Sequence, residues 1–270
     1  MATYLDGIVA WHRARAAEAV TPLAERAARA AEANRLDPPR PFEAALASRG
    51  GIAVIAEVKR RSPSKGDLDP HLDPADVAAA YELGGAACLS VLTDEPHFGG
   101  SPADLAAARG AVALPVLRKD FTVSVADVYD ARAMGADAVL LIAAVLTDDE
   151  LAACGEVARG LEMAALFEVH DEAEADRVCA AGASLVGVNQ RDLHSFEVDR
   201  ARACRVAAHL PETVVKVAES GIESPADVLM LEAAGYDAVL VGERLVRSPD
   251  RSAAIRHLTS ASRSARTSCG

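Results

Sequence analysis

The sequence predicts an α/β fold, a (β/α)8 TIM barrel with an N-terminal helical extension, from three observations. Short apolar runs alternate with segments of helical spacing from residue 52 onward. A motif that opens on glycine recurs at intervals of about 50 residues. The apolar runs contain few polar residues, which is typical of parallel strands covered by helices on both faces. A doubly wound open sheet is the alternative that these observations leave.

Residues 1–48 have helical spacing, and the stretch DPPRP at 37–41 breaks it. This predicts an N-terminal helical extension (1–48), followed by the barrel (49–258) and a polar, frayed tail (259–270). The first strand is Ile52–Val58. The later predicted strands are Cys88–Leu92, Val116–Arg118, Ala138–Ala144, Ala164–Val169, Leu185–Val188, Val214–Val217 and Ala238–Val241. The predicted helices are Asp73–Leu83, Ala103–Arg109, Ser124–Met134, Asp148–Arg159, Glu172–Ala181, Arg200–His209, Pro225–Ala234 and Ser252–Leu258.

The recurring glycines indicate where helices end. Gly84, Gly135, Gly182 and Gly235 each precede a run such as GADAVLLI or GYDAVLVG. A glycine can end a helix in the left-handed conformation, and the apolar run after it then forms the next strand. The repeat therefore supports four βαβα units that close into one barrel.

Composition excludes several classes of protein. The chain of 270 residues is 51% hydrophobic and has a net charge of -12, which disfavours nucleic acid and anionic membranes as partners. It contains no apolar run long enough for a membrane span and no signal-peptide core. Its five cysteines form no C-x-x-C pair, which indicates a reduced chain. We expect a cytoplasmic protein with no obligate protein partner.

Polar residues follow most of the predicted strands, where a barrel places its functional groups. Glu57 and Lys59 end the first strand and are two residues apart, so both should point to one face. A surface ion pair is the alternative explanation for these two alone. The other strands end in Arg118-Lys119-Asp120-Phe121, Glu168, Asn189-Gln190-Arg191-Asp192, Glu219-Ser220-Gly221 and Gly242-Glu243. Agreement among six strands favours a functional site.

The turns after the last two strands, at Glu219-Ser220-Gly221 and Gly242-Glu243, could bind an anion. Small residues let backbone N–H groups approach a phosphate, and barrels commonly bind phosphate after strands seven and eight. Phe98 and Phe121 follow strands two and three and could sandwich an aromatic substrate or pack under loops. The sequence contains no H-x-x-x-H motif, glycine-rich dinucleotide fingerprint or G-x-S-x-G elbow. We therefore expect neither a metal nor a cofactor.

Several sequence blocks resemble one family over nearly the whole chain. They are IAEVKRRSPS (55–64), SVLTDE (90–95), FGGS (98–101), LRKDF (117–121), LFEVH (166–170), GVNQRDL (187–193) and AESGI (218–222). In this order they resemble indole-3-glycerol phosphate synthase of tryptophan biosynthesis. The resemblance implies a lyase that converts 1-(2-carboxyphenylamino)-1-deoxyribulose 5-phosphate, a phosphorylated small molecule, into indole-3-glycerol phosphate, CO2 and water.

The resemblance also implies roles for the strand-end residues. Lys119 would be the general acid of ring closure, and Glu168 the base of dehydration with Lys59 assisting. Lys59, paired with Glu57, could instead hold a substrate anion. The catalytic candidates are therefore Lys119, Glu168, Lys59, Glu57, Asn189 and Ser220. The substrate-binding candidates are Ser62, Pro63, Phe98, Phe121, Leu140, Ile142, Arg191, Glu219, Gly221, Gly242 and Glu243. Among all the candidates, Ser220, Gly221, Gly242 and the backbone of Glu243 would hold the phosphate.

Two positions depart from the family pattern. Glu243-Arg244 replaces a small serine at the phosphate turn, and Gln190 replaces a smaller residue and could narrow the site. Neither removes a candidate catalytic group. A phosphoribosylanthranilate isomerase is disfavoured because no cysteine ends a strand as its chemistry requires. A barrel enzyme with an altered substrate, or a non-catalytic paralogue, remains the alternative, although a paralogue would be expected to lose site charges.

Overall fold

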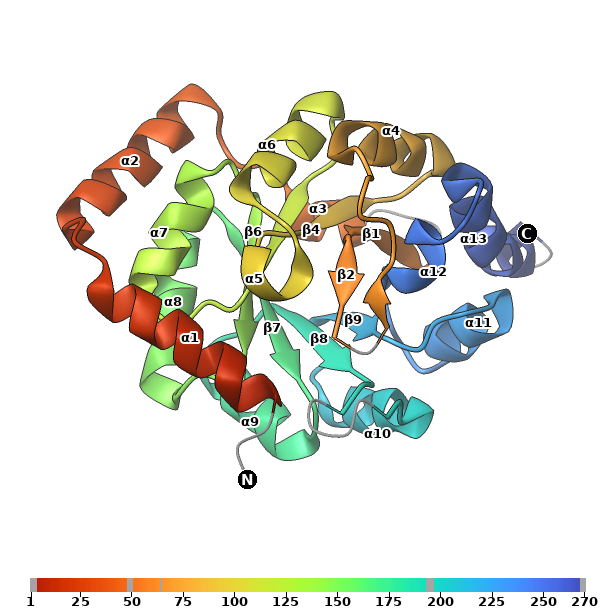
Figure 1. The fold of residues 1–270 in the computed structure, drawn as a ribbon. Coiled ribbons are helices and arrows are strands. Elements are labelled where there is room, and N and C mark those ends of the chain that lie inside the picture. Colours follow the sequence, from red (N-terminus) through yellow and green to blue (C-terminus); the bar gives the residue numbers. More distant parts are fainter. Residues whose placement is uncertain (1–3, 48–50, 64, 193–196, 268–270) are drawn as a thin grey trace.

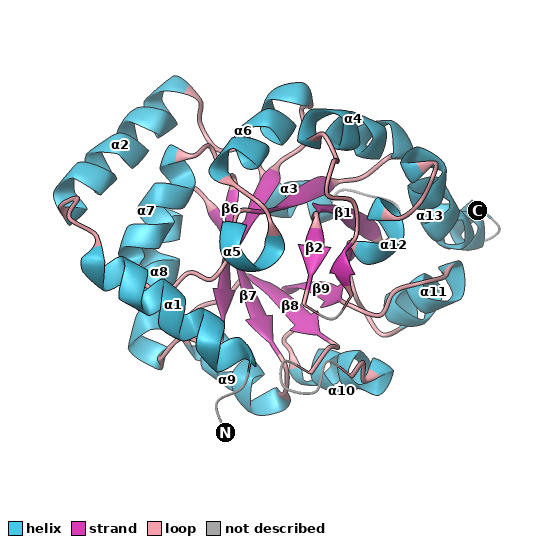
Figure 2. Cartoon of the chain, in the orientation of Figure 1, coloured by secondary structure: helices cyan, strands magenta, loops and turns pink. Residues whose placement is uncertain are grey.

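The computed structural model describes residues 4–47, 51–63, 65–192 and 197–267 and contains a closed barrel of parallel strands (Figure 2). The chain closes the ring by pairing the first barrel strand with the last, so that Ile55 lies opposite Leu240. The barrel prediction is confirmed, and the open-sheet alternative is wrong. The barrel strands are β1 (Ala53–Val58), β4 (Cys88–Leu92), β5 (Val116–Lys119), β6 (Ala138–Ile142), β7 (Ala164–Val169), β8 (Leu185–Asn189), β9 (Val215–Glu219) and β10 (Ala238–Val241).

Helices follow the strands and form an outer ring. Several begin at a capping box, such as Ser101 with Asp104 and Thr147 with Glu150, which satisfies the free N–H groups of the first turn. They are α4 (Pro74–Gly84), α6 (Pro102–Ala111), α7 (Val125–Ala133), α8 (Asp148–Gly160), α9 (Glu172–Ala180), α10 (Arg200–His209), α11 (Pro225–Ala233) and α13 (Arg251–Thr267).

The glycine repeat ends helices as predicted, with one correction. Gly135, Gly182 and Gly235 have left-handed φ values of 97°, 81° and 87°. In the first copy that conformation belongs to Gly85, at φ 91°, and not to Gly84. Gly84 is still helical, and a Cβ there would lie 2.9 Å from the carbonyl oxygen of Ser252. Its small size therefore lets α4 pack closely on α13.

The N-terminal extension runs along the barrel from one end to the other (Figure 1). Helix α1 (Tyr4–Glu18) lies at the carboxyl ends of the strands, α2 (Leu23–Leu36) packs along α7, and α3 (Phe42–Ala47) lies at the opposite end. Phe42 and Leu46 of α3 are buried against the side chains that fill the barrel interior, including Ile55 and Leu117. Helix α3 therefore closes the amino-terminal end of the barrel. The predicted boundary at residues 48 and 49 lies outside the described residues.

Some elements differ from the prediction. A small hairpin, β2 (Arg61–Ser62) with β3 (Gly66–Asp67), follows β1 in a stretch without alternating apolar residues. Short helices α5 (Glu95–Phe98) and α12 (Glu243–Val246) follow β4 and β10. Helix α13 continues to Thr267, so the tail predicted to be frayed from residue 259 is helical that far. Ile255 and Leu258 anchor this helix in the core.

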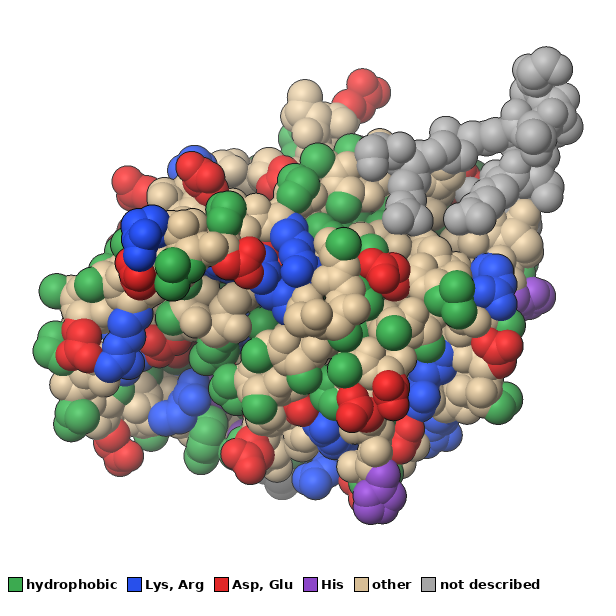
Figure 3. Space-filling model, turned by 90° about the horizontal axis from the view of Figure 1, so that it is seen from above, with side chains coloured by type: hydrophobic (Ala, Val, Ile, Leu, Met, Phe, Trp, Pro, Cys, Tyr) green, Lys and Arg blue, Asp and Glu red, His purple; other side chains and the backbone are tan. Residues whose placement is uncertain are grey.

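The surface does not gather charge of one sign on the face seen in Figure 3, where acidic and basic side chains are interspersed. Among the helices within the described residues, none combines the length and the apolar character that a bilayer span requires.

Candidate active site

A cavity of about 580 Å³ opens at the carboxyl ends of the strands. Every residue that the sequence predicted for the site lines it, although these residues come from all eight barrel strands or from the segments that follow them. From the predicted catalytic set these are Glu57, Lys59, Lys119, Glu168, Asn189 and Ser220, and from the predicted binding set Ser62, Pro63, Phe98, Phe121, Leu140, Ile142, Arg191, Glu219, Gly221, Gly242 and Glu243.

Lys119 forms the centre of a buried charged cluster in this cavity. Its Nζ donates to Oε2 of Glu168 at 2.9 Å and lies 3.6 Å from Oε2 of Glu219. The three side chains come from the ends of β5, β7 and β9. Because all three are largely buried, their charges interact strongly.

The cluster shifts the pKa values of its members in different directions. Burial would lower the pKa of Lys119, but the charges of Glu168, Glu219 and Glu57 outweigh it and raise that pKa. Burial opposes ionisation of Glu168, but Lys119 and then His170 lower its pKa below the ordinary range. Burial, together with the charge of Glu168, raises the pKa of Glu219 to about 8. These shifts favour the ammonium form of Lys119, the carboxylate form of Glu168 and the protonated form of Glu219.

Asn189 orients Glu168 from the neighbouring strand. Its Nδ2 donates to Oε1 of Glu168 at 3.2 Å, and its Oδ1 accepts from Ser220 Oγ at 2.8 Å and from the backbone N–H of Arg191 at 3.0 Å. Ser220 has a left-handed φ of 66°, and Gln190 donates to its carbonyl oxygen at 2.7 Å. Gln190 thus supports this turn from behind and does not line the cavity, so the expected narrowing is not seen.

Glu57 and Lys59 form a second charged pair in the cavity. Oε1 of Glu57 contacts Nζ of Lys59, as their spacing at the strand end predicted. A Cβ on Gly242 would lie 2.1 Å from Oε1 of Glu57 and 3.2 Å from Nζ of Lys59. The absence of a side chain at Gly242 therefore leaves the space that this pair occupies, a reason that the sequence alone did not reveal.

Phe98 and Phe121 line the same apolar part of the cavity, and their rings pack against each other. Their ring centroids are 6.4 Å apart at an angle of 39°. Leu140 and Ile142 of β6 also line the cavity. This arrangement provides two aromatic rings and an aliphatic surface, which suits a flat aromatic ring.

Other lining residues escaped the prediction. Lys65, Arg244 and Arg247 add positive charge, and the guanidinium of Arg247 lies 4.0 Å from the carboxylate of Glu243. Lys65 lies between β2 and β3, and Arg247 directly follows α12; Arg244 is on α12 and had been named only as the neighbour of Glu243. Their position beyond the strand ends was the available signal. Asp94 and Asp120 were part of quoted motifs but were given no role. The remaining unpredicted lining residues are Leu92, Val198, Ile222, Glu223, Leu240 and Val241.

The structure also brings together His12, Asp94 and His97, whose ligand atoms lie within 4.8 Å of one another. Among the described residues this is the group with the spacing of metal ligands, and no sequence motif indicated it because His12 is on α1. Asp94 already accepts hydrogen bonds from His12 at 3.1 Å and from the backbone and ring of His97. These contacts satisfy its carboxylate without an ion.

The fold and the cavity define a TIM-barrel enzyme with acid and base groups at the carboxyl ends of its strands. The family model of indole-3-glycerol phosphate synthase matches residues 5–258. The chain belongs to the indole-3-glycerol phosphate synthase family, as its sequence motifs predicted.

Relatives with this name match nearly the whole chain. The indole-3-glycerol phosphate synthase of Mycolicibacterium gilvum is 51% identical over 263 residues, 96% of this chain and 95% of that protein. The protein of the same name from Rhodococcus jostii is 50% identical over 257 residues, 95% of this chain and 93% of that protein. Among solved structures, a thiamine phosphate pyrophosphorylase from Pyrococcus furiosus matches with a TM-score of 0.60 at 15% identity, covering 80% of this chain and 96% of that one. That likeness concerns the fold alone.

Proposed function

We propose that this chain is a carbon-carbon lyase that forms indole-3-glycerol phosphate, CO2 and water from 1-(2-carboxyphenylamino)-1-deoxyribulose 5-phosphate. The observation that carries the proposal is the buried ammonium of Lys119 bonded to Glu168, because this reaction needs an acid and a base in succession. Family membership supports it. The site also retains every charge that the proposal uses, which disfavours a non-catalytic paralogue.

Ring closure is the step that we assign to Lys119. The ring carbon that carries the carboxylate attacks the ketone carbon, and the ketone oxygen takes a proton from Lys119 as the new bond forms. The raised pKa of Lys119 keeps the proton in place at neutral pH, and a developing alkoxide is basic enough to remove it. Loss of CO2 then returns its bonding electrons to the ring and restores aromaticity.

Proton loss from Lys119 prepares Glu168 for its own step. The charge of Lys119 is the main attractive influence that lowers the pKa of Glu168, so a neutral amine leaves Glu168 more basic. Glu168 then removes a proton from the carbon next to the departing hydroxyl, which Lys59 protonates to water. The 2.9 Å hydrogen bond lets Glu168 return a proton to Lys119. Lys119 and Lys59 donate one proton each, and Glu168 removes one proton from the substrate. The net uptake of one proton matches the one proton that the overall decarboxylation consumes.

The remaining residues bind the substrate in this proposal. Ser220, Gly221, Gly242 and the backbone of Glu243 hold the phosphate, and Lys65, Arg244 and Arg247 supply positive charge that offsets Glu243. The anthranilate ring packs against the paired rings of Phe98 and Phe121. Asn189 and Arg191 anchor its polar end, with Asn189 also orienting Glu168. Ser62, Pro63 and Glu219 complete the wall.

The test is a turnover assay on the purified chain with the synthetic substrate. Indole formation is followed by fluorescence, and CO2 is trapped from the same sample. We expect one molecule of CO2 for each molecule of indole-3-glycerol phosphate formed, and no turnover of phosphoribosylanthranilate. Absence of indole with a folded protein would reject the proposal. The cytoplasmic location is part of the same proposal, and the free thiols of Cys88 and Cys154 support it.

A further inference from the structure

Helix α1 directs a histidine into the wall of the cavity. The buried residues of α1 are Leu5, Ile8 and His12, at the spacing of one helical face. His12 is 1% exposed and occupies a position where an apolar side chain would be expected on packing grounds. Its Nδ1 is buried and has no hydrogen-bond partner among the described residues. Burial of such a group costs stability, which indicates that this position serves more than the docking of α1.

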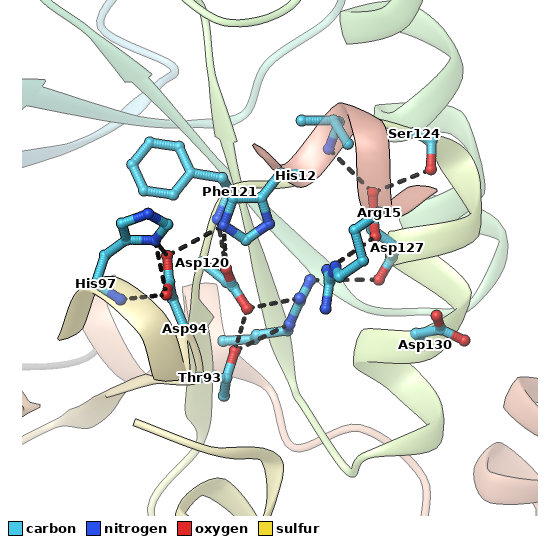
Figure 4. Close-up of polar contacts among 12 residues, drawn as sticks. His12, Arg15, Thr93, Asp94, His97, Asp120, Phe121, Ser124, Asp127 and Asp130 are labelled. Atoms are coloured by element: carbon cyan, nitrogen blue, oxygen red, sulfur yellow. Dashed lines mark hydrogen bonds and ion pairs between the residues drawn. The ribbon is translucent and has the colours of Figure 1, made fainter. Parts of the chain in front are cut away.

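His12 lies between two buried carboxylates that both line the cavity (Figure 4). Its Nε2 is 3.1 Å from Oδ2 of Asp94 and 3.7 Å from Oδ1 of Asp120. Its ring also packs against Phe121, with centroids 5.4 Å apart. Without a donor between them, two buried carboxylates at this seam would repel each other. A Leu or Ile side chain, which the buried helix face favours, has no hydrogen-bond donor and could not replace the contact of His12 with Asp94.

Each carboxylate fixes one ring of the aromatic pair, defined by Phe98 and Phe121. Asp94 caps α5 by accepting from the backbone N–H of His97 at 3.0 Å, and α5 carries Phe98. Asp120 accepts from the backbone N–H of Phe121 at 2.8 Å.

Other partners hold Asp120 from below. Its Oδ2 accepts from Arg118 at 2.7 Å and from Thr93 at 2.5 Å. These contacts leave Oδ1 for the backbone of Phe121 and place it near His12. His12 is therefore the side chain that connects the supports of both rings.

We propose that His12 is a positioning residue for substrate binding, which holds Phe98 and Phe121 in the arrangement that the aromatic ring of the substrate contacts. The N-terminal helix thereby sets the affinity for the aromatic end of the substrate, although His12 is not one of the residues that line the cavity. The inference rests on the proposed function only in placing the anthranilate ring against this aromatic pair.

The test compares His12→Leu with His12→Gln. Leucine suits the buried helix face and should leave the protein folded, but it removes the donor to Asp94. We expect His12→Leu to raise KM by about 10-fold, the scale of one charged hydrogen bond, with kcat within about 2-fold of the wild-type value. Gln retains a donor at a similar distance and should restore most of the affinity.

Arg13→Ala is the matched control. Arg13 is adjacent on α1 and donates to Glu150 at 2.9 and 3.0 Å, away from the aromatic pair, so its loss weakens docking of the helix alone. The single tryptophan, Trp11, reports in each variant whether α1 remains docked, since its ring packs on His12 and His97. Arg13→Ala should leave KM unchanged.

Calorimetry with a substrate analogue whose ketone is reduced to an alcohol separates this inference from the proposed function, because that analogue binds and cannot cyclise. A Kd weakened about 10-fold in His12→Leu supports the inference even if turnover is absent. A wild-type Kd and KM in His12→Leu, equal losses in His12→Leu and His12→Gln, or an equal loss in Arg13→Ala would overturn it.

Discussion

At the scale of single residues, Lys119 and Glu168 share a hydrogen bond but are assigned to different steps. Replacement of Lys119 by Met removes the ammonium and keeps an unbranched side chain of similar length. We expect kcat to fall by about 10²-fold or more, the scale of a positioned proton donor, with folding intact. Rapid-quench measurement should show that release of CO2 is slow, because decarboxylation follows ring closure.

Glu168→Gln should interrupt the reaction later. The amide keeps the shape of the side chain and can still contact Asn189, but it cannot accept a proton from carbon. Ring closure and decarboxylation should proceed while dehydration stalls, so CO2 release should outrun indole formation in a single turnover. Identical CO2 and indole time courses in this variant and in Lys119→Met would contradict the division of roles, although not the overall reaction.

At the scale of elements, helix α3 closes the end of the barrel opposite the cavity. Leu46 is 1% exposed and packs into the barrel interior. We expect Leu46→Ala to lower the free energy of unfolding by about 3 kcal/mol, as for other buried leucines, with kcat and KM little changed. Equilibrium unfolding in urea measures the change in the free energy of unfolding.

Leu36→Ala on α2 is the matched control, since Leu36 is 68% exposed. It should change the free energy of unfolding by less than about 0.5 kcal/mol. A large loss of activity in Leu46→Ala at permissive temperature would show that the closed end communicates with the cavity, contrary to this expectation.

At the scale of the whole molecule, the buried Glu219 makes stability depend on pH. Its pKa is raised from 4.5 to about 8, so the folded state binds more protons than the unfolded state between these values. Stability should therefore fall as pH rises through this window, by up to about 1.4 kcal/mol per pH unit from this group. Glu219→Gln should flatten that decline. Thermal unfolding of the wild-type protein and of Glu219→Gln at several pH values tests this prediction. Parallel plots of stability against pH would exclude Glu219 as the source of the pH dependence.

The sequence by itself determined the barrel, the order of its strands and many of the residues that line the cavity. Parallel strands must be apolar along their length, and residues such as Lys119 and Glu168 stand out where those runs end. Because the carboxyl ends of all barrel strands meet at one mouth, position along each strand was enough to place these side chains together. The boundaries of short elements, such as β2 and α12, were not predictable, since two to four residues give no periodic pattern.

Only the tertiary structure decided which groups touch and how their protons are distributed. Glu168 and Glu219 are both strand-end glutamates in sequence, yet Lys119 lies nearer to Glu168, so the pKa of Glu168 is lowered and that of Glu219 is raised. His12 lies far from Asp94 along the chain, and only the docking of α1 reveals their contact. Such couplings depend on distances of a few ångströms between segments remote in sequence, and local residue patterns contain no information on them.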